Sequence, residues 1–430
     1  MDYKIIGVNT GNSLDAADAV LTEFSGNKMT DLADYSMPYP QSLREDFLKI
    51  RRKTGQANAH EKISMAELAE WPLFKKAHQT YIRLIARTVK NLLQKAQMKP
   101  DDITAIGFHG QTLDHYPPSV AGDDKNVYTL QIGSGQALAD LTGIPVIYDF
   151  RSDDIMHGGE AAPLAPTHNK NIAHGLGLTD VVFYNAGNTG NIAVIFGDEV
   201  IGWDAGPFND FADKMVFSYT HGKECYDKDA KYGLRGSVDE KLLKILFDTA
   251  AVTARGTNYL DLLPPKSSDP SWYRLPAELS GDANFETKLC TVEYFAAYAA
   301  VYTLKFVPQD MKLPSHFILF GGGWNNPVCR RAFEDLLNGN GIVLPEHKEI
   351  FESIIKRFDA PVHFEISRLS KFMEARLMAD LARFYLERRP WFSKPLKPGH
   401  TPVVLGVRRA PHEGGQNDQI SRAAKGWQDK

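Results

Sequence analysis

Two widely separated segments of the chain repeat one pattern, in which an apolar strand, a turn of small residues and a returning strand follow each other. The first segment has expected strands over 5–8 and 19–24 around a Gly-bearing loop, and the second has them over 181–184 and 192–196 around a turn at 185–191. A match this short also arises by chance. A true repeat is what two homologous lobes that grip one nucleotide would need, so the pattern favours a duplicated α/β chain.

The length and composition agree with two lobes of a soluble protein. A chain of 430 residues is too long for one compact core of ordinary size. Its hydrophobic content of 43% and charged content of 24% are ordinary for soluble proteins. We expect an N-terminal lobe over 1–150, which also takes in the last helix near 369–387 or tail segments, a C-terminal lobe over 151–407, and a poorly ordered polar tail over 408–430.

Charge and cysteine content exclude several classes of protein. The 49 Lys and Arg against 53 Asp and Glu give a net charge of −4, which provides no sequence-independent attraction to nucleic acid. Cys225, Cys290 and Cys329 show no CxxC spacing, so the sequence predicts no structural zinc site and suits a reducing compartment. Because the chain has neither a signal-like start nor a long apolar run, we expect a cytoplasmic protein without a membrane segment.

Helical and strand patterns alternate along the chain. We expect helices from 72 to about 97 and over 239–250, 286–306 and 369–386, and strands over 103–108, 144–148 and 316–320. Polar residues follow the strands, among them His109, Gln111 and Arg151. Because α/β sheets bind ligands at the ends of their strands, these side chains are candidates for substrate contact. A hydrogen-bonded structural role is an equal expectation for His109, and a salt bridge with Asp153 or Asp154 is the alternative for Arg151.

Two glycine-containing loops are candidates for nucleotide binding. The first, Gly11-Asn12-Ser13-Leu14-Asp15, combines backbone N–H groups, hydroxyls and a carboxylate, which suit phosphate and Mg²⁺. A plain hairpin turn explains the same residues, and the loop matches neither a Walker loop nor a dinucleotide fingerprint. The second, Gly321-Gly322-Gly323, follows a strand and lets backbone approach a flat ligand or phosphate, whereas a simple turn would need one Gly.

The motifs of the chain, taken in order, resemble one family. They read GVNTGNSLDAAD, HGQT, LQIG, DFRSDD, GGEAAPLAP, NAGNTGN, WDAGPFND, YDKD, PPKS, GGGWNNP and FMEA. In order and spacing they are similar to the anhydro-N-acetylmuramic acid kinases and the related levoglucosan kinases, from Gly7 to about Ala379. The resemblance implies an actin-like (ribonuclease H-like), duplicated two-lobe sugar kinase fold with a central cleft. It also implies ATP, Mg²⁺, and hydrolytic opening of a 1,6-anhydro sugar with phosphorylation of its 6-oxygen.

The resemblance also implies residue roles. Asp204 in Trp203-Asp204-Ala205-Gly206-Pro207 corresponds to the base that activates water, and a carboxylate can take that proton at neutral pH. Asp15 and Glu374 correspond to metal ligands, although Glu374 among charged helix neighbours also suits a solvated face. Arg151, Glu160, His109 and Gln111 are expected on the substrate side. The expected nucleotide-binding residues are Gly11, Asn12, Ser13, Leu14, Asn185, Gly187, Asn191, Gly206, Asn209, Gly321, Gly322, Gly323 and Asn326.

The sequence departs from the family at several of these positions. Ala16 and Phe208 stand where the family usually has glycine, and Phe208 is expected to crowd the backbone near the base. Glu160 replaces a frequent glutamine and adds charge where an anionic muramic acid would bind. After Ser267 the usual Thr-Gly-Arg-Glu is absent. With these changes, the sequence does not decide which sugar is the substrate.

Three hypotheses therefore follow. The first is a kinase for 1,6-anhydro-N-acetylmuramic acid in peptidoglycan recycling. Its partner is this small-molecule sugar, and the resemblance implies a homodimer. The second is a kinase for a neutral anhydrosugar such as levoglucosan or for an ordinary hexose. The third is a non-catalytic sensor of sugar or nucleotide. Because a sensor has no need to keep base and metal carboxylates together, the set Asp15, Arg151, Asp204 and Glu374 favours catalysis.

Overall fold

A computed structural model describes residues 2–11, 13–26, 28–56, 63, 65–119, 121, 127–250, 252, 256–267, 273–276, 279, 282–367, 372–392 and 402–412. These residues form two compact units. Unit 1 takes its described residues from Met1–Ala161, Lys371–Phe392 and Gly399–Lys430, and unit 2 takes them from Ala162–Ser370. Unit 1 thus extends to residue 161 and also takes in the described segments 372–392 and 402–412. No helix in the described ranges is long and apolar enough to cross a membrane.

Unit 1 is built on a six-stranded sheet with the strand order β13-β7-β4-β1-β2-β3. Its strands are β1 (Asp2–Thr10), β2 (Ala16–Ser25), β3 (Lys28–Pro38), β4 (Ala105–Phe108), β7 (Val146–Tyr148) and β13 (Val407–Arg409). A separate hairpin consists of β5 (Gln111–Tyr116) and β6 (Tyr128–Ile132). The helices are α1 (Gln41–Gln56), α2 (Met65–Ala69), α3 (Pro72–Ala96), α4 (Gly135–Thr142), α5 (Phe150–Met156) and α12 (Met373–Leu386).

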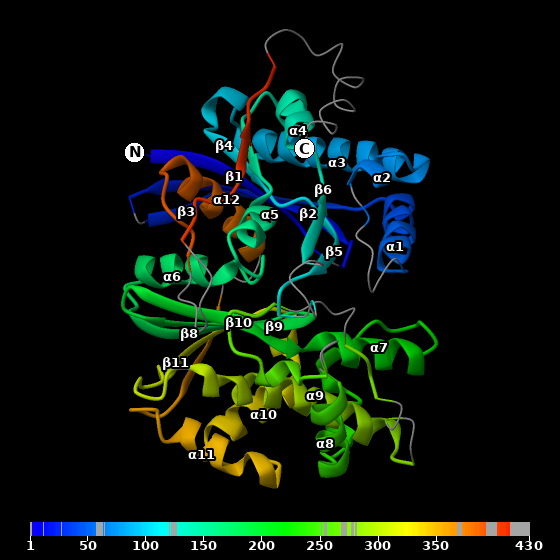
Figure 1. Ribbon diagram of the computed structural model, residues 1–430, viewed down its shortest axis with the longest axis vertical. Coiled ribbons are helices and arrows are strands. Elements are labelled where there is room, and N and C mark those ends of the chain that lie inside the picture. The colour runs from blue at the N-terminus through cyan, green and yellow to red at the C-terminus, as the bar shows by residue number, and fades with distance from the viewer. Residues whose placement is uncertain are drawn as a thin grey trace. The chain divides into compact units, whose positions relative to one another are not determined.

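The two faces of the unit 1 sheet are covered by different helices because side chains alternate along each strand. Ile6 and Ile106 join the hydrophobic core that contains residues of α1, α3 and α4. Their neighbours Gly7 and Gly107 face α12 instead, and a Cβ at either position would overlap a backbone oxygen of that helix. Glycine therefore permits α12 to lie directly on β1 and β4, although α12 comes from a distant part of the chain (Figure 1).

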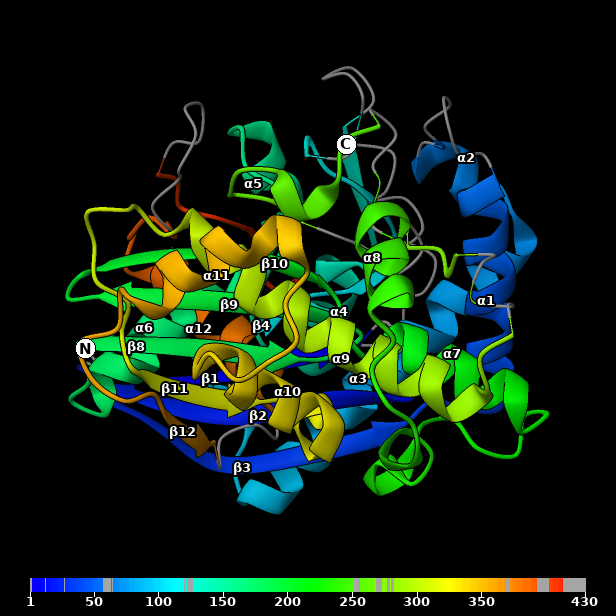
Figure 2. The same ribbon diagram turned by 90° about the horizontal axis from the view of Figure 1, so that it is seen from below.

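Unit 2 is built on a five-stranded sheet with the order β10-β9-β8-β11-β12. Its strands are β8 (Asp180–Ala186), β9 (Thr189–Phe196), β10 (Glu199–Pro207), β11 (His316–Phe320) and β12 (His363–Ile366). The helices are α6 (Ala165–Gly175), α7 (Asn209–Tyr219), α8 (Glu240–Thr249), α9 (Phe285–Tyr302), α10 (Pro327–Leu337) and α11 (Lys348–Ile355). Gly202 of β10 faces Pro166 of α6, whereas Ile201 and Trp203 face the core with α9. Figure 2 shows α9, α10 and α11 beside this sheet.

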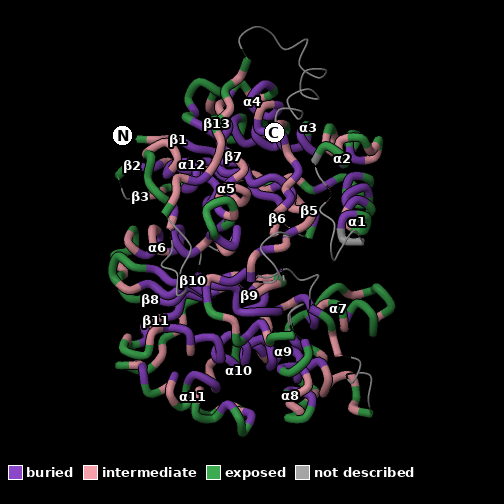
Figure 3. The backbone as a smooth tube through the Cα atoms, viewed as in Figure 1, coloured by how far each residue is buried: buried purple, intermediate pink, exposed green. Residues whose placement is uncertain are grey.

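The two sheets share one topology. In each, the first strand pairs antiparallel with the second, the second pairs antiparallel with the third, and the fourth and fifth continue parallel to the first. The shared order is β3-β2-β1-β4-β7 in unit 1 and β10-β9-β8-β11-β12 in unit 2. This is the ribonuclease H-like arrangement, so the predicted duplicated α/β fold is confirmed. Strand β4, in the middle of the unit 1 sheet, is buried throughout, and β10, at the edge of the unit 2 sheet, is buried after its first residue (Figure 3).

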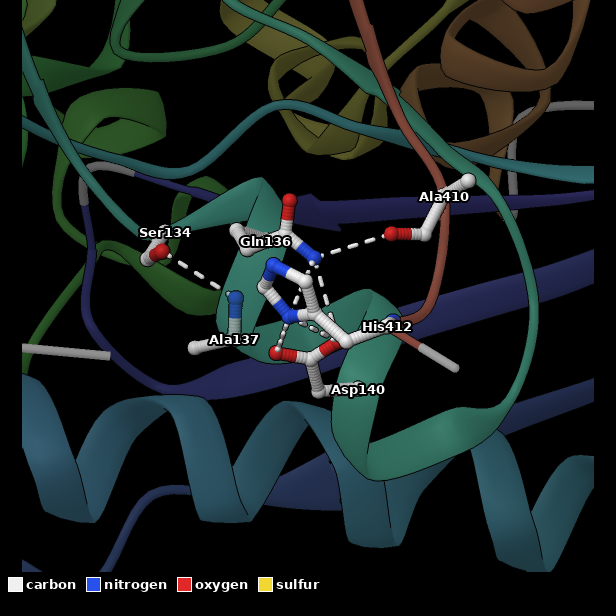
Figure 4. Close-up of polar contacts among 6 residues, drawn as sticks. All are labelled: Ser134, Gln136, Ala137, Asp140, Ala410 and His412. Carbon is white, nitrogen blue, oxygen red and sulfur yellow. Dashed lines mark hydrogen bonds and ion pairs between the residues drawn. The ribbon is translucent and has the colours of Figure 1, made fainter. Parts of the chain in front are cut away.

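The described C-terminal segment is an ordered part of unit 1. Strand β13 pairs antiparallel with β7, and the Gly406 N–H donates to Asp153 Oδ2 at 2.8 Å. Beyond β13, the His412 N–H donates to Asp140 Oδ1 at 2.9 Å, and Gln136 Nε2 of α4 donates to the Ala410 carbonyl at 2.8 Å (Figure 4). The expectation of a poorly ordered tail from residue 408 is therefore corrected for residues 408–412, while 413–430 lie outside the described residues.

Candidate active site

The first predicted phosphate loop joins β1 to β2 in unit 1. Ser13 Oγ donates to Asp15 Oδ1 at 2.6 Å, and Leu14 has a positive φ of 56°. The Leu14 side chain is buried in the core, so only its main chain remains available for the predicted nucleotide contact. Gly11 carries no bulky side chain that would block an approach, and Asn12 lies outside the described residues. The loop thus keeps hydroxyl, carboxylate and backbone groups within a few residues of each other.

Side chains from other elements clamp this loop. Gln111 Nε2 donates to the Gly11 carbonyl at 3.1 Å, while Gln111 Oε1 accepts from Tyr39 Oη at 2.7 Å. The Tyr39 N–H donates to the Asp15 carbonyl at 2.8 Å, and Thr10 Oγ1 donates to the Gly110 carbonyl at 3.0 Å. Gln111 is 0% exposed and both ends of its amide are bonded inside the protein. Its predicted substrate contact is therefore corrected to a role in holding the loop.

Glu374 lies beside the end of β1 because α12 packs on that strand. Asn9 Nδ2 donates to Glu374 Oε2 at 2.6 Å. Loss of hydration raises the pKa of Glu374, although its side chain keeps access to solvent. The positive charge of Arg151 and the hydrogen bond from Asn9 lower this pKa. The negative charges of Asp18 and Asp15 raise it. Carboxylates that repel each other in this way are a suitable donor set for a divalent cation.

The described residues contain no cluster of three or more His, Cys, Asp or Glu side chains arranged to hold a metal. Mg²⁺ does not require such a cluster, because it usually keeps several waters and takes one or two carboxylates together with phosphate oxygens. Asp15 and Glu374 act on one another electrostatically and fit that pattern. Their metal role stays a prediction.

Arg151 is held in place by two acceptors at the start of α5. Its Nε donates to His109 Nε2 at 2.8 Å, and its Nη1 donates to the Ala161 carbonyl at 2.7 Å. His109 Nδ1 lies 2.7 Å from the Gly110 carbonyl, so both ring nitrogens of His109 have partners within the protein. The hydrogen-bonded structural role that was the alternative for His109 is thus observed, and its substrate contact stays a prediction. Arg151 acts electrostatically on Glu374, so the predicted sugar contact and the predicted metal ligand belong to one neighbourhood.

Glu160 also has a different environment from the one expected. The residue is 3% exposed, and its Oε2 accepts a hydrogen bond from the Ser119 N–H at 3.0 Å. A buried carboxylate that accepts backbone hydrogen bonds is held in place by them, so part of its charge is already compensated. The expectation that Glu160 adds a charge beside the sugar stays a prediction.

In unit 2, Asp204 lies on β10 and is 6% exposed. It pairs in register with Asn191 of β9, after which the register shifts between Asp204 and Gly206. Gly206 has a φ of 123°, which favours glycine. A bulge of this kind next to a functional residue re-aims its side chain. The Asp204 N–H donates to the Lys266 carbonyl at 3.1 Å, and Tyr259 Oη donates to the Asp204 carbonyl at 3.0 Å.

The second predicted phosphate turn lies next to Asp204. Asn185 and Asn191 face each other across β8 and β9, and Gly187 lies in the turn between these strands. The Asn209 N–H donates to the Gly187 carbonyl at 3.0 Å, and Asn209 Nδ2 donates to the Ala186 carbonyl at 3.3 Å. Asn209 therefore braces the turn from the start of α7. The structure brings Asn185, Gly187, Asn191, Gly206 and Asn209 into one neighbourhood with Asp204.

The three glycines after β11 have different surroundings. A Cβ at Gly321 would lie 2.6 Å from the Ala186 carbonyl oxygen, and Gly321 has a φ of 93°. A Cβ at Gly323 would lie 2.5 Å from Asn209 Oδ1. At Gly322 a Cβ meets no atom within 4 Å among the described residues. Packing thus explains Gly321 and Gly323, and Gly322 is the member of the triplet with open space beside it.

Asn326 and Phe208 both point into the protein. Asn326 Oδ1 caps α10 by accepting from the Val328 and Cys329 N–H groups, and its Nδ2 donates to Glu293 Oε1 at 2.7 Å. Both atoms of the side-chain amide thus have partners within unit 2, and the nucleotide contact of Asn326 stays a prediction. Phe208 is buried, with its ring 5.2 Å from that of Trp324, and a Cβ at Gly323 would lie 2.5 Å from Phe208 Cε1. The expected crowding of the backbone near the base stays a prediction.

Several residues near the site were not among the predicted ones. Asn9, Tyr39, Tyr259 and Lys266 hold Glu374, the first loop and Asp204. Of these, Asn9 and Lys266 lie in motifs that the sequence singled out, GVNTGNSLDAAD and PPKS. No local pattern marks the two tyrosines, because their hydroxyls meet partners that are distant in the sequence.

Comparison with known proteins gives a consistent result. The family model described as anhydro-N-acetylmuramic acid kinase matches residues 3–350. The anhydro-N-acetylmuramic acid kinase of Cupriavidus pinatubonensis is 33% identical over 94% of this chain and 97% of its own, and that of Vibrio vulnificus is 30% identical over 94% and 95%. Among solved structures, a ROK hexokinase from Thermus thermophilus aligns with a TM-score of 0.38 and 15% identity over 88% of this chain and 97% of that one, and this score carries no further argument.

Proposed function

Because the chain belongs to the anhydro-N-acetylmuramic acid kinase family, we propose that it is an ATP-dependent kinase that opens a 1,6-anhydro sugar with water and phosphorylates the freed 6-oxygen. The proposed sugar is 1,6-anhydro-N-acetylmuramic acid, and the product is N-acetylmuramic acid 6-phosphate, as peptidoglycan recycling requires. The observation that best supports this proposal is the position of Asp204, a carboxylate of low exposure at a bulge beside the turn between β8 and β9.

Asp204 acts as the base in this proposal. It takes a proton from a water molecule while that water attacks the anomeric carbon of the sugar. The bond between the anomeric carbon and the bridging 6-oxygen breaks, and its electron pair stays on the 6-oxygen. The 6-oxygen then forms a bond to the γ-phosphorus, and the bond from that phosphorus to ADP breaks. The proton ends on Asp204, so one carboxylate serves both bond-making events.

Unit 1 supplies the proposed metal and sugar contacts. Asp15 and Glu374 would hold Mg²⁺, which neutralises phosphate charge when it is bound. Arg151 presents a guanidinium fork whose Nε and Nη1 positions are fixed by His109 and Ala161, which suits recognition of planar or anionic groups. The backbone at Gly11 and Gly322 is proposed to approach phosphate or nucleotide, since Gly322 has open space beside it.

The muramic acid substrate is supported over a neutral anhydrosugar by two observations. The matched relatives bear the name of that kinase over nearly their whole length. The negative charge of Glu160 argued against an anionic sugar, but this side chain is buried and accepts a hydrogen bond from the Ser119 N–H. The loop after Ser267 diverges from the family, and its residues 268–272 lie outside the described ones. A sensor without activity is disfavoured because the sequence retains both the proposed base, Asp204, and the proposed metal carboxylates, Asp15 and Glu374.

We also propose a cytoplasmic location and a homodimer. The location is supported by Cys225, Cys290 and Cys329, all of which are free thiols, as expected in a reducing compartment. The homodimer rests on the family resemblance alone, and light scattering of the purified protein measures it directly.

The experiment offers ATP and Mg²⁺ with anhydro-N-acetylmuramic acid, levoglucosan and glucose in parallel, with products identified by mass spectrometry. The expected product is heavier than anhydro-N-acetylmuramic acid by one water and one phosphoryl group. Asp204→Asn keeps ATP binding and loses turnover by a factor of about 10³ or more. A product that gains only a phosphoryl group, or full activity of Asp204→Asn, contradicts the proposed chemistry.

A further inference from the structure

We propose that Lys266 and Tyr259 are positioning residues for the reaction, because they fix the main chain of Asp204 at the bulge of β10. This inference rests on the proposed role of Asp204 as the base. Lys266 belongs to the PPKS motif, to which the function described above assigns no part, and Tyr259 lies in no motif.

Three hydrogen bonds close a ring among these residues. The Asp204 N–H donates to the Lys266 carbonyl at 3.1 Å. Lys266 Nζ donates to the Tyr259 carbonyl at 2.8 Å, and Tyr259 Oη donates to the Asp204 carbonyl at 3.0 Å. Each residue donates once and accepts once within the ring. The peptide groups on both sides of the Asp204 Cα are therefore fixed from outside the sheet.

The position of Asp204 explains why such a ring matters. Strand β10 is at the edge of the unit 2 sheet, and its only paired strand is β9 within the described residues. The pairing register shifts directly after Asp204. A residue at a shift of this kind has less support from its neighbouring strand, and the direction of its side chain follows its own backbone angles. The ring replaces the missing support at the residue whose carboxylate has to meet the water.

Lys266 is well suited to anchor the ring. It is 0% exposed, and its Nζ lies 4.5 Å from the centre of the Tyr259 ring and 4.6 Å from that of Phe306. A desolvated ammonium over aromatic faces is held more strongly than one at the surface. Tyr259 is itself buried, at 1% exposure. Both partners of Asp204 are therefore buried within unit 2.

The two side chains are positioning residues rather than catalytic ones. The Lys266 ammonium and the Tyr259 hydroxyl both donate to main-chain carbonyls, and neither bond involves the Asp204 carboxylate. Their loss should thus displace the base without removing it. A small displacement of a catalytic group lowers the rate of the chemical step more than it changes substrate binding.

The test uses the full chain with ATP, Mg²⁺ and anhydro-N-acetylmuramic acid. Tyr259→Phe removes one hydroxyl and keeps the aromatic ring under Lys266. We expect kcat to fall by about 10-fold to 100-fold, with KM for sugar and for ATP within about 2-fold of the wild type. Tyr302→Phe is the matched control, since Tyr302 is also buried and its Oη donates to Asp261 Oδ1 at 2.7 Å rather than to the main chain of Asp204. It should keep the wild-type kcat.

Lys266→Met and the double variant Tyr259→Phe/Lys266→Met complete the set. Because the bonds belong to one ring, the double variant should lose about as much kcat as the more impaired single variant. Thermal unfolding of every variant checks that the fold is kept. If Lys266→Met does not give folded protein, Tyr259→Phe and its control decide alone.

The outcomes separate this inference from the proposed function. An inactive wild type, or an active Asp204→Asn, overturns the function and with it the base. If the wild type is active and Asp204→Asn is not, a Tyr259→Phe variant with wild-type kcat overturns the positioning role. Equal losses in Tyr259→Phe and Tyr302→Phe, a rise in KM in place of the fall in kcat, or additive effects in the double variant also overturn it.

Discussion

Arg151 and His109 are joined by a hydrogen bond in which the guanidinium Nε donates to the imidazole Nε2 over 2.8 Å. Because the guanidinium has only donors, His109 Nε2 must be the acceptor, and Nδ1 carries the proton that is donated to the Gly110 carbonyl. Burial, together with the charge of Arg151, lowers the pKa of His109 to about 3. The imidazole is therefore neutral at physiological pH and serves to orient the arginine.

This pair predicts a graded effect of substitution at His109. His109→Ala removes the acceptor, so the guanidinium loses one of its two fixed positions, and kcat/KM for the sugar should fall by about 10-fold. His109→Gln retains an oxygen acceptor, so its kcat/KM for the sugar should fall less. Steady-state kinetics at saturating ATP measure both variants. A His109→Ala enzyme with unchanged kcat/KM would show that Arg151 keeps its orientation without His109.

The lowered pKa of His109 also predicts how stability depends on pH. The ordinary pKa of an unfolded histidine is about 6.5, so between about 6.5 and 3 the unfolded state binds more protons than the folded state. Stability then rises with pH, and the contribution present above pH 6.5 is lost as the pH falls. Each pH unit below 6.5 should cost about 1 kcal/mol through this group. Urea unfolding at pH 7.5, 6.5 and 5.5 measures the slope, and His109→Gln should make it shallower. Equal slopes would contradict the assignment.

The glycine triplet predicts opposite results at neighbouring positions. At Gly321 an added methyl group would meet the Ala186 carbonyl oxygen at 2.6 Å in a backbone conformation with positive φ, so Gly321→Ala should lower the free energy of unfolding by about 2 kcal/mol or more. Gly322→Ala meets open space, and its free energy of unfolding should stay within about 0.5 kcal/mol of the wild type. If nucleotide approaches there, KM for ATP should rise several-fold in Gly322→Ala. Denaturation and ATP titration measure the two effects, and an unstable Gly322→Ala with normal ATP affinity would reverse the assignment.

Glu374 predicts a change in metal dependence. Glu374→Gln keeps the shape and the hydrogen-bonding capacity toward Asn9 but removes one charge from the neighbourhood of Asp15 and Asp18. The Mg²⁺ concentration that gives half-maximal rate should rise by about 10-fold. Glu387→Gln, beyond the end of α12, is the control, because Glu387 pairs with Arg389. An unchanged Mg²⁺ requirement in Glu374→Gln would remove it from the metal site.

The elements with strong periodicity could be predicted from the sequence. The helix expected from 72 to about 97 is Pro72–Ala96, and it ends where Gln97 takes a left-handed conformation. The strand expected over 181–184 lies within Asp180–Ala186, and the helix expected over 286–306 begins at Phe285. Strand β3 was not predicted, because Lys28–Pro38 is largely exposed and lacks an apolar alternation. This segment is a strand because it pairs with β2, and the local sequence does not indicate that pairing.

The candidate site could also be predicted from the sequence only in part. Small residues drew attention to the two predicted phosphate loops, whereas Asp204 and Glu374 were singled out by the family resemblance. Whether a polar side chain faces a ligand or the interior is decided by partners far away in the chain, such as Tyr39 for Gln111 and Arg151 for His109. Asn326 is an example, since its amide caps α10 and contacts Glu293 of α9. Spacing alone carries no information about such partners.

The packing of α12 on Gly7 and Gly107 has a consequence for how the chain is made. A ribosome releases β1 and β4 early, whereas the helix that covers one face of their sheet emerges only after all the described elements of unit 2. Unit 2 is continuous from α6 to β12, so it can fold on the nascent chain while unit 1 is still incomplete. The unit that begins first therefore finishes last, and during synthesis its open sheet face is the surface that a chaperone would have to protect.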